Sequence, residues 1–134
     1  MTDVPAGEDV LTVPDGMDLA VAYREIIKEN IEYGCLVDRY GADRMDEIVE
    51  LMLETVLSKR QYICIAGDDY PRELVKSKFL KINSMHIAYV LDCLDKNTTK
   101  VANIKAYLLA ALFNAPTTMD SYYRAEVNYD FDIA

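Results

Sequence analysis

Apolar residues recur with the period of an α-helix through most of this chain, and this pattern limits what the chain can fold into. From residue 18 onward, apolar side chains recur at every third or fourth position, which is the spacing of one face of an amphipathic α-helix. Asp18 suits the N-cap of a first helix and Gly41 suits its end. We predict one helix over residues 18–40, in which Gly34 marks a kink or a close contact.

The same spacing continues in a second predicted helix over residues 43–59. Its core face carries Met45, Ile48, Val49, Met52, Leu53 and Val56. A third helix is predicted over residues 71–82, because Pro71 suits the first helical position. Its basic residues Arg72, Lys76 and Lys81 are expected to face solvent.

Three further helices are predicted in the second half of the chain. The first runs to Lys96, and the next places Ile104 and Leu108 inward. The latter should end before Pro116, because the residue that precedes a proline disfavours the helical conformation. A last helix then continues to about residue 128. The expected first residues or caps of these helices are Asn83 or Ser84, Thr98 or Thr99, and Thr117 or Thr118.

Between the second and third helices the apolar period changes from 3.6 to 2. In QYICIAGDD, residues 61–69, apolar side chains alternate as they do in a short β-strand. Gly67, Asp68 and Asp69 at the end of this segment are typical turn residues. The sequence therefore predicts one short strand here, or at most one small hairpin.

These patterns together predict a mainly α fold, a single compact bundle of about five to six helices with one short strand or small hairpin. The length of 134 residues suits one domain. Residues 1–17, with two prolines and four acidic residues, are predicted to be a flexible lead-in. Residues 18–128 form the expected helical domain, and residues 129–134 the expected C-terminal tail.

Composition excludes several classes of protein. No apolar run reaches the roughly 18 residues needed to span a bilayer, and the N-terminus lacks the basic and apolar regions of a signal peptide. We therefore expect a cytoplasmic protein with no membrane contact. The three cysteines, Cys35, Cys64 and Cys93, are odd in number and far apart, which argues against a disulfide framework or a zinc site.

No motif of catalytic or cofactor-binding chemistry is present in the chain. It contains no Gly-rich phosphate loop, no HExxH and no GxSxG. Asp68 and Asp69 could ligate a metal, but a turn explains them better. His86 and Cys93 could form a reactive pair, yet on one helix they would lie about 10 Å apart along the axis. We therefore expect that the chain has no catalytic residue, binds no metal or cofactor, and is not an enzyme.

The chain's net charge of −9 is unevenly distributed. Residues 58–113 hold nine basic and five acidic residues, whereas the segments before and after them are acidic. Exposed cations interleaved with Tyr62, Tyr70 and Tyr89 would suit nucleic acid or a protein partner. The alternative is solubilising charge, partly paired with the acidic helices. The candidate contact residues are Lys59, Arg60, Arg72, Lys76, Lys78, Lys81, Lys100 and Lys105.

A row of acidic residues in the first two predicted helices suggests a second kind of surface. Solvated charge is the ordinary interpretation of such a row. The alternative is a DNA mimic or a blocking surface, of the kind that small acidic inhibitors of defence nucleases present. The residues of this row are Asp38, Asp43, Asp46, Glu47, Glu50 and Glu54.

Five segments of the chain carry a resemblance to a known group of proteins. They are YREIIKENIEY, DEIVELMLETVLSKR, IAGDDYPRELVKSKFLKINS, HIAYVLDCLDKNTTKVANIKAYLLAALFNAP and SYYRAEVNYD. Over residues 22–130 the chain resembles the C-terminal domain of unknown function of RepA-type replication initiators from plasmids and conjugative elements of Gram-positive bacteria. The spacing of Ile104, Tyr107, Leu108, Leu112 and Asn114 is also similar to that in the helical domains of DnaD-type primosome proteins.

The resemblance implies a role in replication of mobile elements, through protein contacts and through DNA contacts. It implies no catalytic residue. In the initiators a winged-helix domain precedes this region, whereas only about seventeen residues precede the first predicted helix here, so sequence-specific origin binding is not expected. The leading hypothesis is a non-enzymatic accessory domain that docks on replication proteins. An anti-CRISPR type inhibitor of a host nuclease is the alternative, and an enzyme is a weaker third.

Overall fold

We analysed a computed structural model that describes residues 16–96 and 103–133, with side chains described over 18–96 and 103–120. The described part holds six helices and one two-stranded hairpin, which confirms the predicted mainly α class. None of its helices is long and apolar enough to cross a membrane. The elements are α2 (Gly16–Asn30), α3 (Tyr33–Tyr40), α4 (Ala42–Val56), β1 (Tyr62–Ile65), β2 (Asp68–Pro71), α5 (Arg72–Phe79), α6 (Ser84–Lys96) and α7 (Ile104–Ile133).

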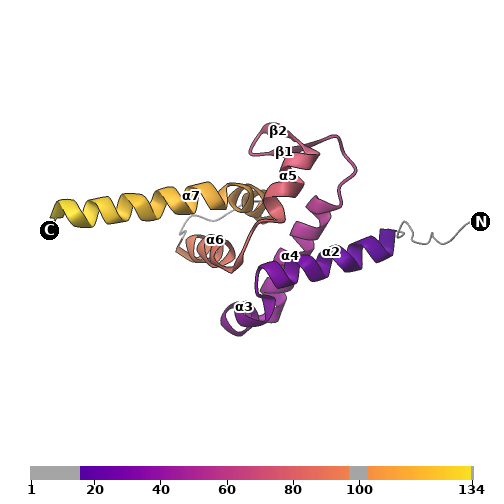
Figure 1. Cartoon of the computed structure of the whole chain (residues 1–134), viewed down its shortest axis with the longest axis horizontal. Helices are drawn as coiled ribbons and strands as arrows, with labels where there is room; N and C mark the ends of the chain where they lie inside the picture. The colour runs from indigo at the N-terminus through magenta and orange to yellow at the C-terminus, as the bar shows by residue number, and fades with distance from the viewer. Residues whose placement is uncertain (1–15, 97–102, 134) are drawn as a thin grey trace, which may run out of the picture.

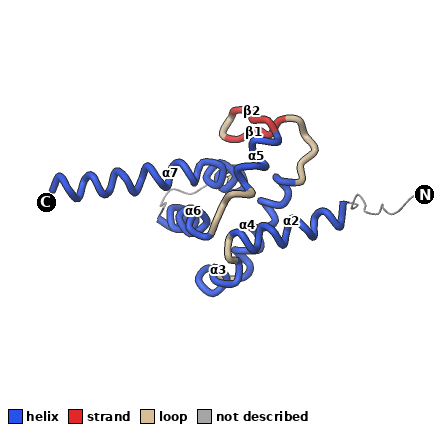
Figure 2. Tube along the Cα trace, in the orientation of Figure 1, coloured by secondary structure: helices blue, strands red, loops and turns tan. Residues whose placement is uncertain are grey.

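Helix α4 is the centre of the bundle. It contacts α2, α3, α5 and α7, while α6 packs mainly against α7 (Figures 1 and 2). The hairpin lies beside α5 and the first part of α7. The two-stranded sheet therefore covers one end of the bundle and does not form a layer of its own.

The predicted core face of α4 is confirmed. Met45, Ile48, Val49 and Met52 are at most 1% exposed, and Leu53 and Val56 are also buried. Burying such a side chain contributes roughly 1.5–3 kcal/mol relative to leaving it exposed, so this face accounts for much of the core. The other large side chains of the same core cluster that are fully buried are Ile27, Ile31, Ile65, Phe79, Ile82, Ile87, Leu91 and Leu112.

The single helix predicted over residues 18–40 is wrong, because the chain breaks at Glu32. Helix α2 ends at Asn30, and Glu32, two residues before Gly34, has φ +54°, a left-handed conformation that separates α2 from α3. Long-range contacts hold the break in place. Asn30 Nδ2 donates to the carbonyl of Leu80 at 2.9 Å, and the Ser84 hydroxyl donates to Glu32 Oε2 at 2.8 Å. The predicted stop at Gly41, with φ +94°, does separate α3 from α4.

The predicted end of a helix before Pro116 is also wrong. Helix α7 runs through Pro116, although a proline inside a helix costs about 3 kcal/mol because it removes a backbone donor and crowds the preceding turn. Packing outweighs this local cost, since Leu112 and Ala115 are fully buried on either side of Phe113. The helix then continues over residues 129–133, where the sequence predicts a tail.

The start of α7 also differs from the prediction. Asn103 caps it, because its Oδ1 accepts the backbone N–H of Ala106 at 3.0 Å. The predicted caps Thr98 and Thr99 lie outside the described residues. Ile104, predicted to face inward, is 45% exposed.

The predicted strand is the first half of a hairpin. Strands β1 and β2 pair antiparallel, and Ala66 and Gly67 join them with φ +54° and +88°. Two residues of positive φ are typical of the tight turns that match the twist of a hairpin. Asp68, expected in the turn, instead pairs with Ile65 within the sheet. Pro71 ends β2 and stands one residue before α5, not within it.

Helix α6 begins with a reciprocal cap that confirms the prediction for Asn83. Asn83 Oδ1 accepts the backbone N–H groups of Met85 at 3.0 Å and His86 at 3.1 Å, and His86 Nδ1 accepts the Asn83 N–H at 3.1 Å. Partial burial lowers the pKa of His86. The lower pKa favours the neutral imidazole, whose Nδ1 atom can accept the Asn83 N–H.

Candidate docking surfaces

The arginines of α2, α3 and α4 are all engaged by carboxylates. Arg24 donates twice to Glu50, at 3.0 and 3.1 Å, and so joins α2 to α4. Arg39 of α3 pairs with Asp92 of α6 at 3.2 Å. Arg44 of α4 pairs in the same way with Asp95 of α6 at 2.7 Å.

Two tyrosine hydroxyls engage further carboxylates in this part of the fold. Tyr40 donates to Asp92 Oδ1 at 2.9 Å; its burial, together with this bond, raises its pKa to about 12. Tyr33 donates to Asp46, which raises the pKa of Tyr33. The hydrogen bond from Arg44 lowers the pKa of Asp95. The N-terminal helices and α6 therefore share a paired polar boundary.

The basic residues around the start of α5 are arranged differently. Lys59 and Arg60 are exposed in the segment between α4 and β1. Arg72 Nη1 donates to the carbonyl of Lys59 at 2.9 Å, which fixes this segment against α5. Lys76 lies one turn further along α5, on the side that faces α2. We call Lys59, Arg60, Arg72 and Lys76 the basic cluster.

A shallow pocket of about 200 Å³ lies within the basic cluster. Its walls include Lys59, Arg72 and Lys76, with Leu19 and Tyr23 of α2 facing them. The Lys76 ammonium lies 5.0 Å from the centroid of the Tyr23 ring, and its hydrogen bond to Tyr23 raises its pKa. The pocket thus combines cations, an aromatic ring and an apolar side chain. Glu73 is the carboxylate at its edge, and it lies 3.5 Å from Arg72 Nε.

The structure does not bring the whole predicted basic set together. Lys78 lies on the opposite flank of α5, with its ammonium 4.5 Å from the Phe113 ring centroid. Lys81 is exposed after the end of α5, and Lys105 pairs with Glu54 at 2.8 Å. Lys100 lies outside the described residues. Among the residues described, Lys59, Arg60, Lys76, Lys78 and Lys81 form no ion pair with a carboxylate.

The tyrosines that the sequence predicts beside these cations also lie in different parts of the fold. Tyr62 is exposed on β1, at 52% of its surface, whereas the Tyr70 ring packs against Phe113 at an interplanar angle of 46°, with ring centroids 4.7 Å apart. Tyr89 lies on α6, away from α5. Tyr23, which the sequence places in the core-facing series of the first helix, is the ring that meets the basic cluster.

The predicted acidic row is partly neutralised. Four of its residues follow one side of α4, at spacings of three and four, but two of them are in ion pairs: Glu50 with Arg24, and Glu54 with Lys105. Asp46 accepts the Tyr33 hydroxyl. The remaining residues of the row, Asp38, Asp43 and Glu47, are exposed.

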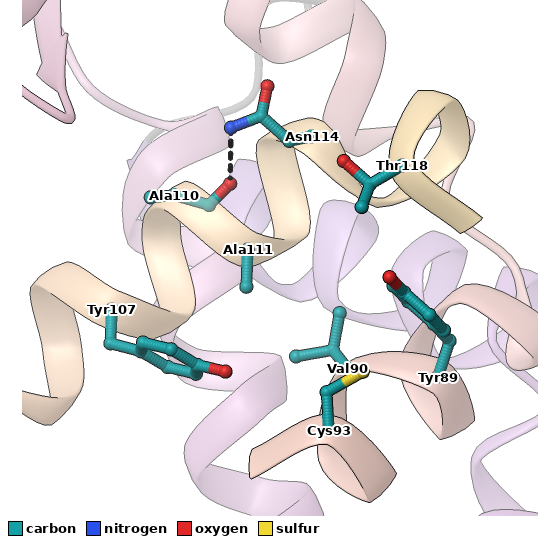
Figure 3. Close-up of a pocket in the computed structure, with 8 residues that line it drawn as sticks. All are labelled: Tyr89, Val90, Cys93, Tyr107, Ala110, Ala111, Asn114 and Thr118. Atoms are coloured by element: carbon teal, nitrogen blue, oxygen red, sulfur yellow. Dashed lines mark hydrogen bonds between the residues drawn. The ribbon is translucent and has the colours of Figure 1, made fainter. Parts of the chain in front are cut away.

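A groove between α6 and α7 has no counterpart in the sequence predictions. It encloses about 400 Å³, and Figure 3 shows Tyr89 and Cys93 of α6 facing α7 across it. The α7 wall includes the small residues Ala110 and Ala111, and the Asn114 amide donates to the Ala110 carbonyl at 2.9 Å. The residues of this wall are Tyr107, Ala110, Ala111, Asn114 and Thr118. The helical spacing of these residues was the sequence signal that could have indicated a groove, but alanines at such spacing are typical of a core.

The structure also places the residues that the sequence suggested for catalysis or metal binding. His86 and Cys93 are not joined, because the His86 Nδ1 atom is occupied by the helix cap and Cys93 lines the groove. No group of three histidine, cysteine, aspartate or glutamate side chains in the described part is placed to hold a metal ion. Asp68 and Asp69 are exposed on β2.

The chain matches a protein-family model over most of its length. Residues 10–134 match a family described as a family of unknown function, DUF6017. Searches among curated proteins and among solved structures give no match.

Proposed function

The chain belongs to the DUF6017 family, and we propose from its surfaces that it is a non-enzymatic accessory domain of mobile-element replication. In this proposal it docks on replication proteins and holds DNA without sequence preference. The basic cluster is the DNA contact in this proposal. The family match itself assigns no activity.

The observation that carries the proposal is the contrast between paired and unpaired cations. Each arginine of the N-terminal helices has a carboxylate partner, whereas Lys59, Arg60 and Lys76 have none among the described residues. Unpaired cations have no carboxylate to displace before they bind a ligand. Phosphate groups are the ligands that arrays of Lys and Arg bind most readily. The Tyr23 ring beside them suits stacking or cation contacts.

The resemblance to RepA-type initiators supplies the biological setting. It covers residues 22–130 and includes the segment that carries the basic cluster. A domain attached to an initiator would work beside DNA already selected by another domain. Binding without sequence preference is sufficient for that role, because phosphate contacts position a protein and carry no base information.

Binding to two unrelated DNA duplexes of equal length tests the proposal. At about 50 mM salt, fluorescence anisotropy should give the same micromolar affinity for both duplexes, since the contacts are to phosphates. No binding to either duplex at this salt concentration would remove the DNA part of the proposal. A strong preference for one duplex would show base readout and contradict it as well.

The inhibitor hypothesis is favoured by one observation, the exposure of Asp38, Asp43 and Glu47 along α3 and α4. A DNA mimic needs a continuous row of free carboxylates, and Glu50 and Glu54 are in ion pairs. We therefore rank this hypothesis second. A nuclease cleavage assay with the protein in excess tests it, and uninhibited cleavage by Cas-type nucleases would count against it.

A further inference from the structure

Half of helix α7 lies outside the bundle. The helix has 30 residues, about 45 Å at 1.5 Å per residue, and its second half extends away from every other element in Figure 1. Among the described side chains of α7, the buried ones are Leu108, Leu112, Phe113 and Ala115, all in its first half. The described residues 117, 118 and 120 are exposed.

The second half of α7, residues 119–133, has little stability in water as a helix unless it packs against a partner. Isolated helices shorter than about 12–15 residues are marginal even when rich in alanine, because most helical stability comes from packing one face. Residues 119–133, MDSYYRAEVNYDFDI, contain four aromatic residues and four other apolar residues. With four acidic residues and one basic residue, this half is also unsuited to DNA.

The groove between α6 and α7 ends where the free half begins. It follows α7 from Tyr107 to Thr118, about 17 Å along the axis, and residues 119–133 span about 21 Å. The α7 wall is built from residues as small as Ala110 and Ala111, which let another helix approach closely. The exposed Met85 lies one turn before Tyr89 on α6 and extends the apolar surface.

We propose that the α6–α7 groove binds the C-terminal half of α7 from a second copy of the chain. The two copies are related by a two-fold axis near Thr118, with their α7 helices antiparallel. The groove and the C-terminal half are parts of one helix and have similar lengths, about 17 and 21 Å, so one rotation places the C-terminal half of each copy in the groove of the other. This closed exchange is what a two-fold interface requires, and a single unrelated peptide would leave the free half uncovered.

Sedimentation velocity across a concentration series tests the proposal with the full chain. Wild type should reach twice the mass of one chain. Ala111→Arg, which blocks the groove, and Ala125→Pro, which breaks the free half, should each weaken the dimer at least tenfold. The control Leu74→Arg, at a 43% exposed position on α5, should not change the mass. Circular dichroism and thermal unfolding check that each variant folds.

Disulfide formation tests the orientation. Position 125 lies eighteen residues after Tyr107, about five helical turns, so it is on the groove face of α7. In a chain with Cys35→Ser and Cys64→Ser, Ala125→Cys should cross-link to Cys93 of the other copy, and Val127→Cys should not. A wild-type monomer, a dimer that both groove variants leave intact, or equal cross-linking from both positions would overturn the proposal. None of these changes touches the basic cluster, so the result is independent of DNA binding.

Discussion

The charges of the N-terminal helices and those around α5 serve different ends. Arg24, Arg39 and Arg44 each meet a carboxylate on another helix and so join α2 to α4 and α6 to α3 and α4. Lys59 and Arg60 meet none among the described residues, and Arg72 bonds chiefly to a backbone carbonyl. The first set contributes to stability, and the second is available for a ligand.

The difference has an energetic meaning. Exposed ion pairs contribute about 0–1 kcal/mol each, so the paired arginines add a modest amount to folding. Within the basic cluster Lys76 contacts the Tyr23 ring, but Lys59 and Arg60 form no ion pair among the described residues and repel their neighbours. Removing them should therefore impair binding and leave stability unchanged, and removing the paired ones should do the reverse.

Reversing the cluster charges should have the largest effect. The triple variant Lys59→Glu, Arg60→Glu, Lys76→Glu should bind duplex DNA about 100-fold more weakly, because three phosphate contacts become repulsions. The matched control carries the same charge change at Lys78, Lys81 and Lys105 and should lose less than about tenfold. Anisotropy titrations measure both. Equal losses in the two variants would mean that net charge decides binding and that the cluster has no special role.

Removing the Tyr40 hydroxyl should have the next largest effect, this time on folding. Tyr40→Phe loses the bond to Asp92 and leaves that carboxylate with one fewer donor, which should lower the free energy of unfolding by about 1 kcal/mol. DNA affinity should not change. Urea titration measures the loss, and Tyr62→Phe on the exposed face of β1 is the control. An unchanged midpoint would show that the paired boundary does not stabilise the fold.

Breaking one arginine pair should have a smaller effect. Arg24→Gln removes two hydrogen bonds to Glu50 and should cost about 0.5 kcal/mol, less at high salt because the pair is exposed to solvent. Arg60→Gln, at an exposed position of the basic cluster, should cost nothing measurable. If Arg60→Gln is the more destabilising of the two, the distinction between paired and available charges is wrong.

The pH dependence through His86 should be the smallest effect. Burial lowers the pKa of His86 below its ordinary value of 6.5, so the unfolded chain binds the proton more readily. The stability from this group is complete above pH 6.5 and is lost as the pH falls through the lowered pKa. His86→Gln keeps an acceptor for the Asn83 N–H without titrating. Urea midpoints should therefore fall more steeply for wild type than for His86→Gln, and parallel curves would contradict the cap.

The sequence predicted what depends on local period and composition. The core face of α4 follows from apolar spacing alone, and Asn83 was recognisable as a cap. The break at Glu32 was not predictable, because Leu80 and Ser84, about fifty residues away, hold it. The prediction at Pro116 was wrong for a related reason. The rule that a helix ends before a proline is local, and here packing with distant residues outweighs it.

The candidate site was predictable only in part. Residue type identified the cations, but their distribution over two flanks of α5 depends on which face packs against α4, and their freedom from carboxylates depends on long-range pairs such as Arg39 with Asp92. Tyr23 was missed because its spacing is that of a core residue. The α6–α7 groove was missed since Ala110 and Ala111 look like core residues until the surrounding helices are placed.

The salt dependence of DNA binding tests the central claim most directly. Four phosphate contacts from the basic cluster should give a slope of log Kobs against log salt of about −3 to −4, and the triple reversal variant should bring that slope close to zero. The same slope in the two proteins, or no binding at low salt, would contradict the assignment of the basic cluster as the DNA contact.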